Sequence, residues 1–247
     1  MPFRRQRKLD SLVTRLQAQY GPRAIHRDPP PRAPAPIPHV STTFPALDAA
    51  LGIGGLPRGR ISEISGRVTS GKLTLAAKIL SAAQREPDAL VAWLDLGRTC
   101  DPDYLYRCGV DLERLLVVRP EDSADALTIL LHLVESNTLA LLVFDSLSDL
   151  RQGDESRLAG ALERLAAIVT QTQTAVIFLS DPGIQFRTLA HLATVRLELR
   201  FERWINLGPD VRGYEGQVKI VKHKLGRAGA EVLIRIAFNG TVSGYGL

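Results

Sequence analysis

The stretch ISEISGRVTSGKLTL, residues 61–75, determines the fold class that the sequence predicts. The apolar residues at its start indicate a β-strand, Gly66 opens a turn, and a helix is expected to start at Gly71 and Lys72. Gly-x-x-x-x-Gly-Lys is the frame of a phosphate-binding loop. In such a loop, backbone N–H groups and the helix N-terminus hold a polyphosphate while the lysine reaches its outer oxygens. We therefore expect a polyphosphate site here.

The residue after this lysine departs from the pattern. A phosphate-binding loop of this kind ends in Ser or Thr, whose hydroxyl binds Mg²⁺, and here the position holds Leu73. Thr74 is a poor substitute, because one residue along a helix turns the side chain by about 100°. The sequence predicts a nucleotide cradle that lacks one metal ligand. The residues expected to form it are Gly66, Arg67, Val68, Thr69, Ser70, Gly71, Lys72, Leu73 and Thr74.

The composition is that of an ordinary globular protein, with 247 residues, 45% of them hydrophobic and 23% charged. The formal net charge of +5 permits nucleic acid as a partner without requiring it. Cys100 and Cys108 match no disulfide framework or zinc pattern and indicate a reducing compartment. No apolar run reaches the ~18 residues of a membrane span, and the charged N-terminus lacks the apolar segment of a signal peptide. We expect a cytoplasmic protein with no membrane partner.

The sequence predicts three parts. Residues 1–27 combine a basic arm with an amphipathic helix, expected from Lys8 to Tyr20 because apolar residues recur there at helical spacing. Residues 28–39 are rich in proline, which excludes a helix or a central strand and indicates an extended linker. Residues 40–247 are expected to form the core domain.

Within the core, continuous apolar runs alternate with helical segments, which is typical of a parallel sheet covered on both faces. The clearest run, 139–144, closes on Asp145. Toward the C-terminus, residues 194–202 alternate strictly, and further strands are expected at 217–224 and 231–238. We predict an α/β core with a mainly parallel sheet flanked by helices and an antiparallel C-terminal meander. Helix caps are expected at Ser41 or Thr42 and at Ser123.

In open parallel sheets, ligands bind beyond the carboxyl ends of the strands. Polar residues stand at such ends at Asp95, Asp145 and Asp181. The apolar strand before Asp145 has the form of a Walker B strand, whose carboxylate holds Mg²⁺ directly or through water. Together with the loop, it predicts a nucleotide site with ATP or ADP and Mg²⁺ as cofactors.

These motifs resemble those of a bacterial RecA recombinase without its C-terminal domain, over nearly the whole chain. The resemblance rests on residues 43–64, Asp101-Pro102-x-Tyr104, Asp145-Ser146, 195–197 and 218–224. It implies a RecA-like P-loop NTPase core in which Asp101 and Tyr104 contact adenine and the tyrosine stacks on the base. It also implies that Lys222 and Lys224 reach the nucleotide of an adjacent protomer, although a solvated basic strand face explains these lysines equally well.

Departures from the family pattern bear on catalysis. The family's catalytic glutamate, two residues past Asp95, is Gly97 here, and its sensor glutamine aligns with Asp181. The two DNA-binding loops are shortened, at 151–155 and 182–188. Because removing one positioned acid–base group typically costs about 10²–10⁴ in rate, we expect ATP hydrolysis to be very slow or absent. Asp181 is a weak candidate for a replacement base.

We therefore expect a RecA-like accessory protein of DNA repair, similar to the ImuA proteins that accompany an error-prone polymerase in damage-induced (SOS) mutagenesis. It would bind nucleotide, DNA with single strands favoured, and a RecA-like protein or an error-prone polymerase, in the bacterial cytoplasm at the nucleoid. The N-terminal helix would support self-association. The alternative is an active DNA-dependent ATPase and recombinase with altered catalytic residues. A further alternative is that the loop is merely structural.

Overall fold

The computed structural model describes residues 3–21, 36–150, 155–183, 186–238 and 242–245. The chain divides into two compact units, residues 1–36 and 37–247, which are described separately.

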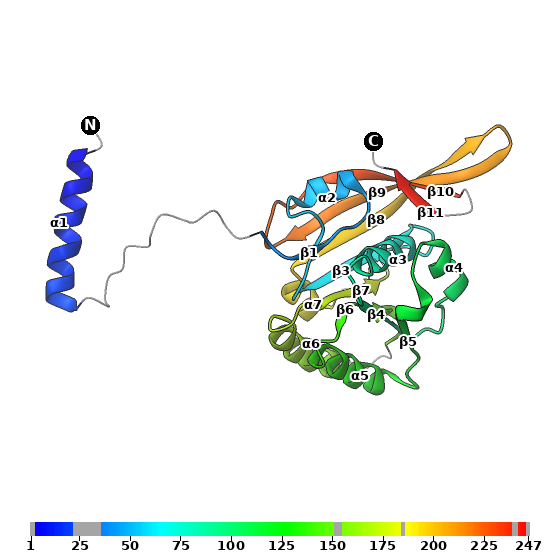
Figure 1. The fold of residues 1–247 in the computed structure, drawn as a ribbon, viewed down its shortest axis with the longest axis horizontal. Coiled ribbons are helices and arrows are strands. Elements are labelled where there is room, and N and C mark those ends of the chain that lie inside the picture. Colours follow the sequence, from blue (N-terminus) through cyan, green and yellow to red (C-terminus); the bar gives the residue numbers. More distant parts are fainter. Residues whose placement is uncertain (1–2, 22–35, 151–154, 184–185, 239–241, 246–247) are drawn as a thin grey trace. The chain divides into compact units, whose positions relative to one another are not determined.

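The helix of the first unit is α1 (Phe3–Tyr20) (Figure 1). It begins earlier than the predicted start at Lys8, so most of the expected basic arm is helical. Arginine, glutamine and lysine are good helix formers, but without apolar residues they give no periodic signal. Leu9 and Leu12, on its apolar stripe, are 48% and 46% exposed. The predicted linker lies outside the described residues as far as residue 35.

The second unit is built on a nine-stranded sheet with the order β11-β10-β9-β8-β3-β7-β6-β4-β5 (Figure 1). The six strands from β8 to β5 pair in parallel, and β8 to β11 pair antiparallel. The structure therefore confirms the predicted mainly parallel sheet with an antiparallel C-terminal meander. The strands are β3 (Ile61–Gly66), β4 (Leu90–Asp95), β5 (Leu115–Val118), β6 (Leu139–Asp145), β7 (Ala175–Ser180), β8 (Val195–Leu207), β9 (Asp210–His223), β10 (Glu231–Phe238) and β11 (Val242–Tyr245).

Helices cover both faces of this sheet, and each face has its own hydrophobic core. On β4, Val91 and Trp93 face the core shared with α2 and α3, whereas Ala92 and Leu94 face the core shared with α5 and α6. Burying a side chain such as Leu94 contributes about 1.5–3 kcal/mol, which explains why strands buried on both faces read as continuous apolar runs. The helices are α2 (Pro45–Leu51), α3 (Lys72–Ala83), α4 (Pro102–Arg107), α5 (Ser123–Glu135), α6 (Glu155–Val169) and α7 (Arg187–Leu192).

The predicted helix caps are wrong in both places. Phe44 is the N-cap residue of α2, and Ser41 and Thr42 instead donate hydrogen bonds to the side chain of Asp48, at 2.6 and 2.7 Å. For α5 the cap is Asp122, whose carboxylate accepts from two backbone N–H groups of the first turn. A carboxylate is a favourable N-cap group, and the sequence alone does not locate the start of a helix to within one residue.

Smaller elements were not predicted. They are β1 (His39–Val40), which pairs with β2 (Leu56–Pro57), the 3₁₀ turns η1 (Leu112–Arg114) and η2 (Leu147–Asp149), and the short α4, α7 and β11. No helix in the described part of the chain is long and apolar enough to span a membrane.

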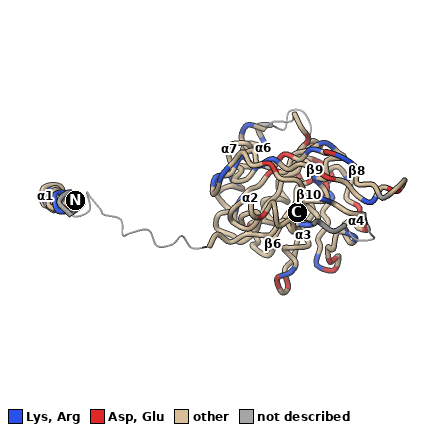
Figure 2. Tube along the Cα trace, turned by 90° about the horizontal axis from the view of Figure 1, so that it is seen from above, with Lys and Arg blue, Asp and Glu red and all other residues tan. Residues whose placement is uncertain are grey.

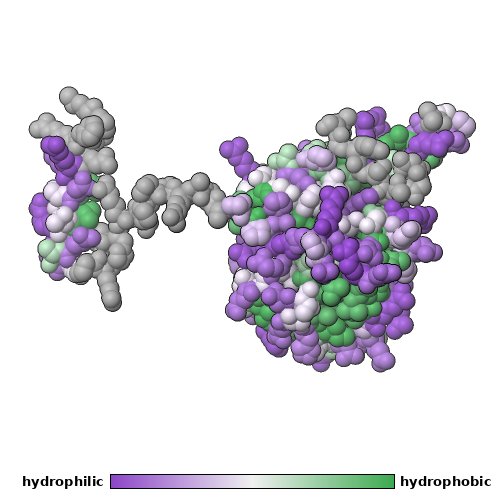
Figure 3. Space-filling model, viewed as in Figure 1, coloured by the Kyte–Doolittle hydropathy of each residue, from purple (hydrophilic) through white to green (hydrophobic). Residues whose placement is uncertain are grey.

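Charged and apolar residues lie on different parts of the surface of the second unit. Lysines and arginines lie along β8 and β9 and near α7, interspersed with acidic residues (Figure 2). Figure 3 shows an apolar area on the side where Figure 1 places β4 and β5. Leu90 and Leu116, on these two strands, are 44% and 47% exposed. Because β5 is an edge strand, its outer backbone groups are available for pairing with another chain.

Candidate nucleotide site

The loop between β3 and α3 has the strand–loop–helix geometry that the sequence predicts. β3 ends at buried Gly66, and Gly71 adopts a left-handed conformation (φ 91°) as the N-cap residue of α3. A Cβ at Gly66 would lie 2.2 Å from Ser70 Oγ, and one at Gly71 would lie 2.6 Å from the hydroxyl of Tyr214. The close contacts at both positions and the positive φ of Gly71 favour glycine there. The backbone N–H groups at the start of α3 therefore form a tight loop suited to an anion.

Lys72, the first residue of α3, is directed at the end of the neighbouring strand β7. Its ammonium group donates to the carbonyl oxygen of Ser180 at 3.2 Å and forms an ion pair with the carboxylate of Asp181. Burial opposes ionisation of Asp181, but its hydrogen bonds with Lys72 and Ser148 outweigh that effect and hold its pKa below the ordinary value. The lysine that should reach a phosphate is thus already paired.

Leu73 and Thr74 offer no hydroxyl to a metal at the loop. Leu73 is half-buried and packs against the hydrophobic core of its face. The hydroxyl of Thr74 is hydrogen-bonded to the hydroxyl of Tyr104 and, at 3.2 Å, to that of Tyr214. These contacts agree with the prediction that Thr74 does not replace the missing metal ligand.

Two buried aspartates stand at the ends of β4 and β6. Asp95 accepts hydrogen bonds from the N–H groups of Thr99 and Cys100, at 2.8 and 3.2 Å, and from Arg119 at 3.0 Å. Asp145 makes no ion pair with any residue in the described part of the chain, and burial together with nearby Asp95 raises its pKa to about 6. A cation at Asp145 would relieve this cost, which fits the predicted Mg²⁺ contact.

The remaining donors for a metal are few. Within the described residues, no three His, Cys, Asp or Glu side chains gather closely enough to hold an ion. A nucleotide-borne Mg²⁺ that keeps most of its waters and touches Asp145 through one of them is compatible with this donor set, whereas a protein-held metal centre is not.

The space beside Gly97 is occupied by a carboxylate that sequence reasoning missed. A Cβ at Gly97 would lie 2.7 Å from Oδ2 of Asp149. Asp149 accepts from the N–H and hydroxyl of Ser146, at 3.2 and 2.8 Å, as the acidic partner of a capping box on η2. The spacing Ser146-x-x-Asp149 after a strand is the signal that would have revealed this residue.

The two residues expected at adenine both have structural partners. Asp101 caps α4 by accepting from the N–H of Asp103 at 2.9 Å. The ring of Tyr104 packs against the core, and the guanidinium of Arg107 lies 5.9 Å from the ring centroid. Their contact with adenine stays a prediction.

Lys222 lies near the end of β9 and Lys224 just past it, so the predicted shared strand face is not formed, but both lysines donate to the last carbonyl groups of α7. Lys222 donates to the carbonyl oxygens of Ala190 and His191 at 2.5 and 2.8 Å, and Lys224 donates to that of Leu192 at 3.2 Å. A contact between protomers stays a prediction. The predicted short loops lie partly outside the described residues, at 151–154 and 184–185.

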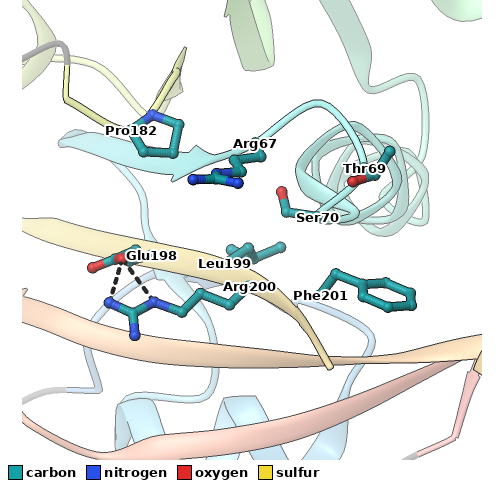
Figure 4. A pocket seen from close by; sticks show the side chains of 8 residues that line it. All are labelled: Arg67, Thr69, Ser70, Pro182, Glu198, Leu199, Arg200 and Phe201. Carbon is teal, nitrogen blue, oxygen red and sulfur yellow. Dashed lines mark hydrogen bonds and ion pairs between the residues drawn. The ribbon is translucent and has the colours of Figure 1, made fainter. Parts of the chain in front are cut away.

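A pocket of about 540 Å³ lies between the loop and β8 (Figure 4). Arg67, Thr69 and Ser70 form one side, and residues 198–201 form the other, where Glu198 and Arg200 are hydrogen-bonded at 2.9 and 3.0 Å. Arg67 makes no ion pair with the described residues, so this pocket presents one unmatched positive charge beside the loop.

Comparison with known proteins identifies the family. The family model for the RecA N-terminal domain matches residues 7–243. The chain belongs to the RecA family. Protein RecA of Streptomyces venezuelae is 34% identical over 248 residues, which cover 90% of this chain and 65% of that protein. Protein RecA of Rubrobacter xylanophilus is 34% identical over 270 residues, which cover 98% of this chain and 78% of that protein.

The RecA-family chain spans about two thirds of the length of the Streptomyces relatives it matches. Its fold is also that of a solved recombinase. The crystal structure of the RadB recombinase matches with a TM-score of 0.67 and 22% identity, covering 84% of this chain and 99% of that one. The predicted RecA-like core is thereby confirmed.

Proposed function

We propose that this RecA-family chain binds a nucleotide in the loop 66–72 and hydrolyses it very slowly or not at all. Its role would be that of an accessory in DNA repair and the SOS response, not that of a recombinase. One observation carries the proposal. Position 97, where the family resemblance places the catalytic glutamate, has no side chain, and a Cβ there would lie 2.7 Å from Oδ2 of Asp149, so Asp149 would have to move to admit one.

Each part of this proposed function is assigned to particular residues of the chain. The backbone N–H groups of the loop and Lys72 would hold the phosphates of ATP or ADP, and Asp145 would hold the nucleotide's Mg²⁺ through water. Asp101 and Tyr104 would contact the adenine. Leu73 supplies no metal ligand and Gly97 supplies no base to activate water, so binding would survive where cleavage does not.

Calorimetric titration with Mg²⁺ and ADP tests the binding half of this proposal. We expect saturable binding to the wild-type chain and a loss of at least about tenfold in affinity in Lys72→Ala, since a charge-assisted contact to phosphate is removed. Equal affinity in the two proteins, or no binding to either, would contradict the nucleotide site and leave the loop as a structural turn.

The family and the positive charges on the surface support DNA and protein partners as part of the proposal. We propose single-stranded DNA as a ligand, with Arg67, Lys222 and Lys224 as phosphate contacts, and self-association through α1. A RecA-like protein or an error-prone polymerase would be the protein partner. Gel-shift affinity should fall steeply with salt, because binding to phosphates releases counterions. Salt-independent binding, or none, would contradict the proposed DNA contacts.

A second candidate function, an active DNA-dependent ATPase, is favoured by one observation. The carboxylate of Asp149 lies beside Gly97, where a base would be needed, although it is held by Ser146. If Asp149 replaces the missing glutamate, turnover should be measurable in the wild-type chain and fall about 10²–10⁴-fold in Asp149→Asn. In Asp181→Asn, which removes the other candidate base, that turnover should persist.

A further inference from the structure

The ion pair between Lys72 and Asp181 joins the phosphate loop to the end of β7. The lysine side chain is 7% exposed and the aspartate side chain 37%, so a buried cation is paired with a partly exposed carboxylate. Ser180 supplies a second acceptor to the same ammonium at 3.2 Å. The lysine therefore has one of its three N–H donors free of these two partners.

The place of Asp181 relative to a bound nucleotide follows from the reach of this lysine. In a phosphate-binding loop the lysine contacts the outer phosphates, whereas backbone N–H groups hold the inner ones. A carboxylate bonded to the lysine ammonium thus stands at the outer end of the cradle. A bound diphosphate would leave the outer end of the cradle to Asp181. A third phosphate would have to share Lys72 with Asp181 or displace the aspartate from it.

Asp181 is held firmly in this position. Its backbone N–H donates to Ser148 Oγ at 3.1 Å, and it directly follows β7, which lies between β3 and β6 in the sheet. Its lowered pKa keeps it ionised at neutral pH. It is a fixed negative charge, not a side chain that yields by protonation.

The hollow next to Asp181 gives a further phosphate no compensating charge. This space of about 210 Å³ is lined by three carboxylates, on Glu63, Asp181 and Glu198, and by one guanidinium, on Arg196. Arg196 is paired with Glu63, and Glu198 is paired with Arg200. An added phosphate would find no unpaired cation among the residues that line this hollow and would have to compete with the carboxylate of Asp181 for Lys72.

We propose that the cradle takes a nucleoside diphosphate in preference to a triphosphate and that Asp181 is the residue that sets this specificity. The inference rests on the proposed nucleotide binding and adds the form of the ligand. The chain would be a sensor or holder of the diphosphate form, with Asp181 acting as the counter-ion that a third phosphate has to displace.

Calorimetric titration of the full-length chain with Mg²⁺ and either ADP or β,γ-imido-ATP tests this inference. The wild-type chain should bind ADP at least about tenfold more tightly than the triphosphate. Asp181→Asn keeps the size of the side chain and removes its charge, so it should tighten triphosphate binding about tenfold or more and change ADP affinity about threefold or less. Glu86→Gln is the matched control, because that carboxylate is also paired with a cation, Arg58, but follows the end of α3 away from the loop, and its two affinities should equal those of the wild-type chain.

The possible results distinguish a failure of the proposed diphosphate preference from a failure of nucleotide binding itself. Binding of both nucleotides with equal affinity, or tighter binding of the triphosphate by the wild-type chain, overturns the role of Asp181 and leaves nucleotide binding intact. If the ratio of ADP affinity to triphosphate affinity in Asp181→Asn equals that of the wild-type chain, the role of Asp181 is likewise overturned and nucleotide binding is left intact. Failure of both nucleotides to bind rejects the proposed function itself. The ratio of ADP affinity to triphosphate affinity in the wild-type chain tests the diphosphate preference even if Asp181→Asn does not fold.

Discussion

At the scale of single residues, Asp149 and Gly97 form a matched pair, since the side chain of one fills the space next to the other. Gly97→Glu should destabilise the fold by about 1–3 kcal/mol, because a new side chain and a second carboxylate are forced into an occupied space. In Gly97→Glu/Asp149→Ala most of that cost should disappear. Urea denaturation of both variants and of Asp149→Ala measures the coupling, and strictly additive costs would contradict the shared space.

Glu215 provides a residue-scale test of pH dependence. This buried carboxylate on β9 is bracketed by Arg203 on β8, at 2.5 Å, and by Arg235 on β10, at 2.6 Å, and these hydrogen bonds lower its pKa. A group with a lowered folded-state pKa stabilises the protein above its unfolded pKa, and this stability is lost as pH falls through the folded-state pKa.

Glu215→Gln should therefore lower the free energy of unfolding at pH 7 by about 1–3 kcal/mol. The difference from the wild-type chain should narrow below the ordinary glutamate pKa of 4.5. Urea titrations at pH 7, 5 and 4 test the sign. A difference that widens toward low pH would contradict it.

The strand, turn and helix of the loop 66–72 could be predicted from the sequence, whereas the side-chain partner of Lys72 could not. Gly66, Gly71 and Lys72 follow from local spacing, because a tight anion-binding turn needs those residue types in that order. The pairing of Lys72 with Asp181 depends on two strands becoming neighbours in the sheet. A single sequence carries no direct signal of that adjacency.

At the scale of secondary-structure elements, α7 is a six-residue helix whose last carbonyl groups accept hydrogen bonds from Lys222 on β9 and from Lys224 just past it. Lys222→Ala should cost about 0.3–1 kcal/mol of stability, because it removes a cation from a helix C-terminus. Lys219→Ala on the same strand breaks only an exposed pair with Glu231 and is the matched control. Stability of Lys222→Ala equal to that of the wild-type chain would contradict a stabilising role of this lysine at the end of α7.

The long elements could be predicted, and the short ones could not. β4 and β6 are continuous apolar runs because both faces of each strand are buried, and that pattern is visible in the sequence. By contrast, α7 is too short to show helical periodicity and depends on lysines more than 30 residues further along the chain. α1 extends past its predicted start because charged residues continue a helix without an apolar signal.

At the scale of the whole molecule, the two hydrophobic cores are formed by residues of the second unit throughout the described part of the chain. We therefore predict that residues 37–247 fold without the first 36 residues. Their thermal midpoint should lie within about 4 °C of that of the full chain, which corresponds to a change of about 1 kcal/mol or less. Calorimetry measures the midpoint. Light scattering tests whether the shortened chain, which lacks α1, no longer self-associates. A midpoint lowered by more than this would show that the first unit stabilises the core.

The central claim is that the cradle holds a nucleotide without cleaving it, and phosphate release tests it most directly. The wild-type chain is incubated with saturating Mg²⁺ and ATP, with and without single-stranded DNA, beside Lys72→Ala as the control. We expect the wild-type rate to equal that of Lys72→Ala under both conditions. DNA-stimulated release that disappears in Lys72→Ala would contradict it.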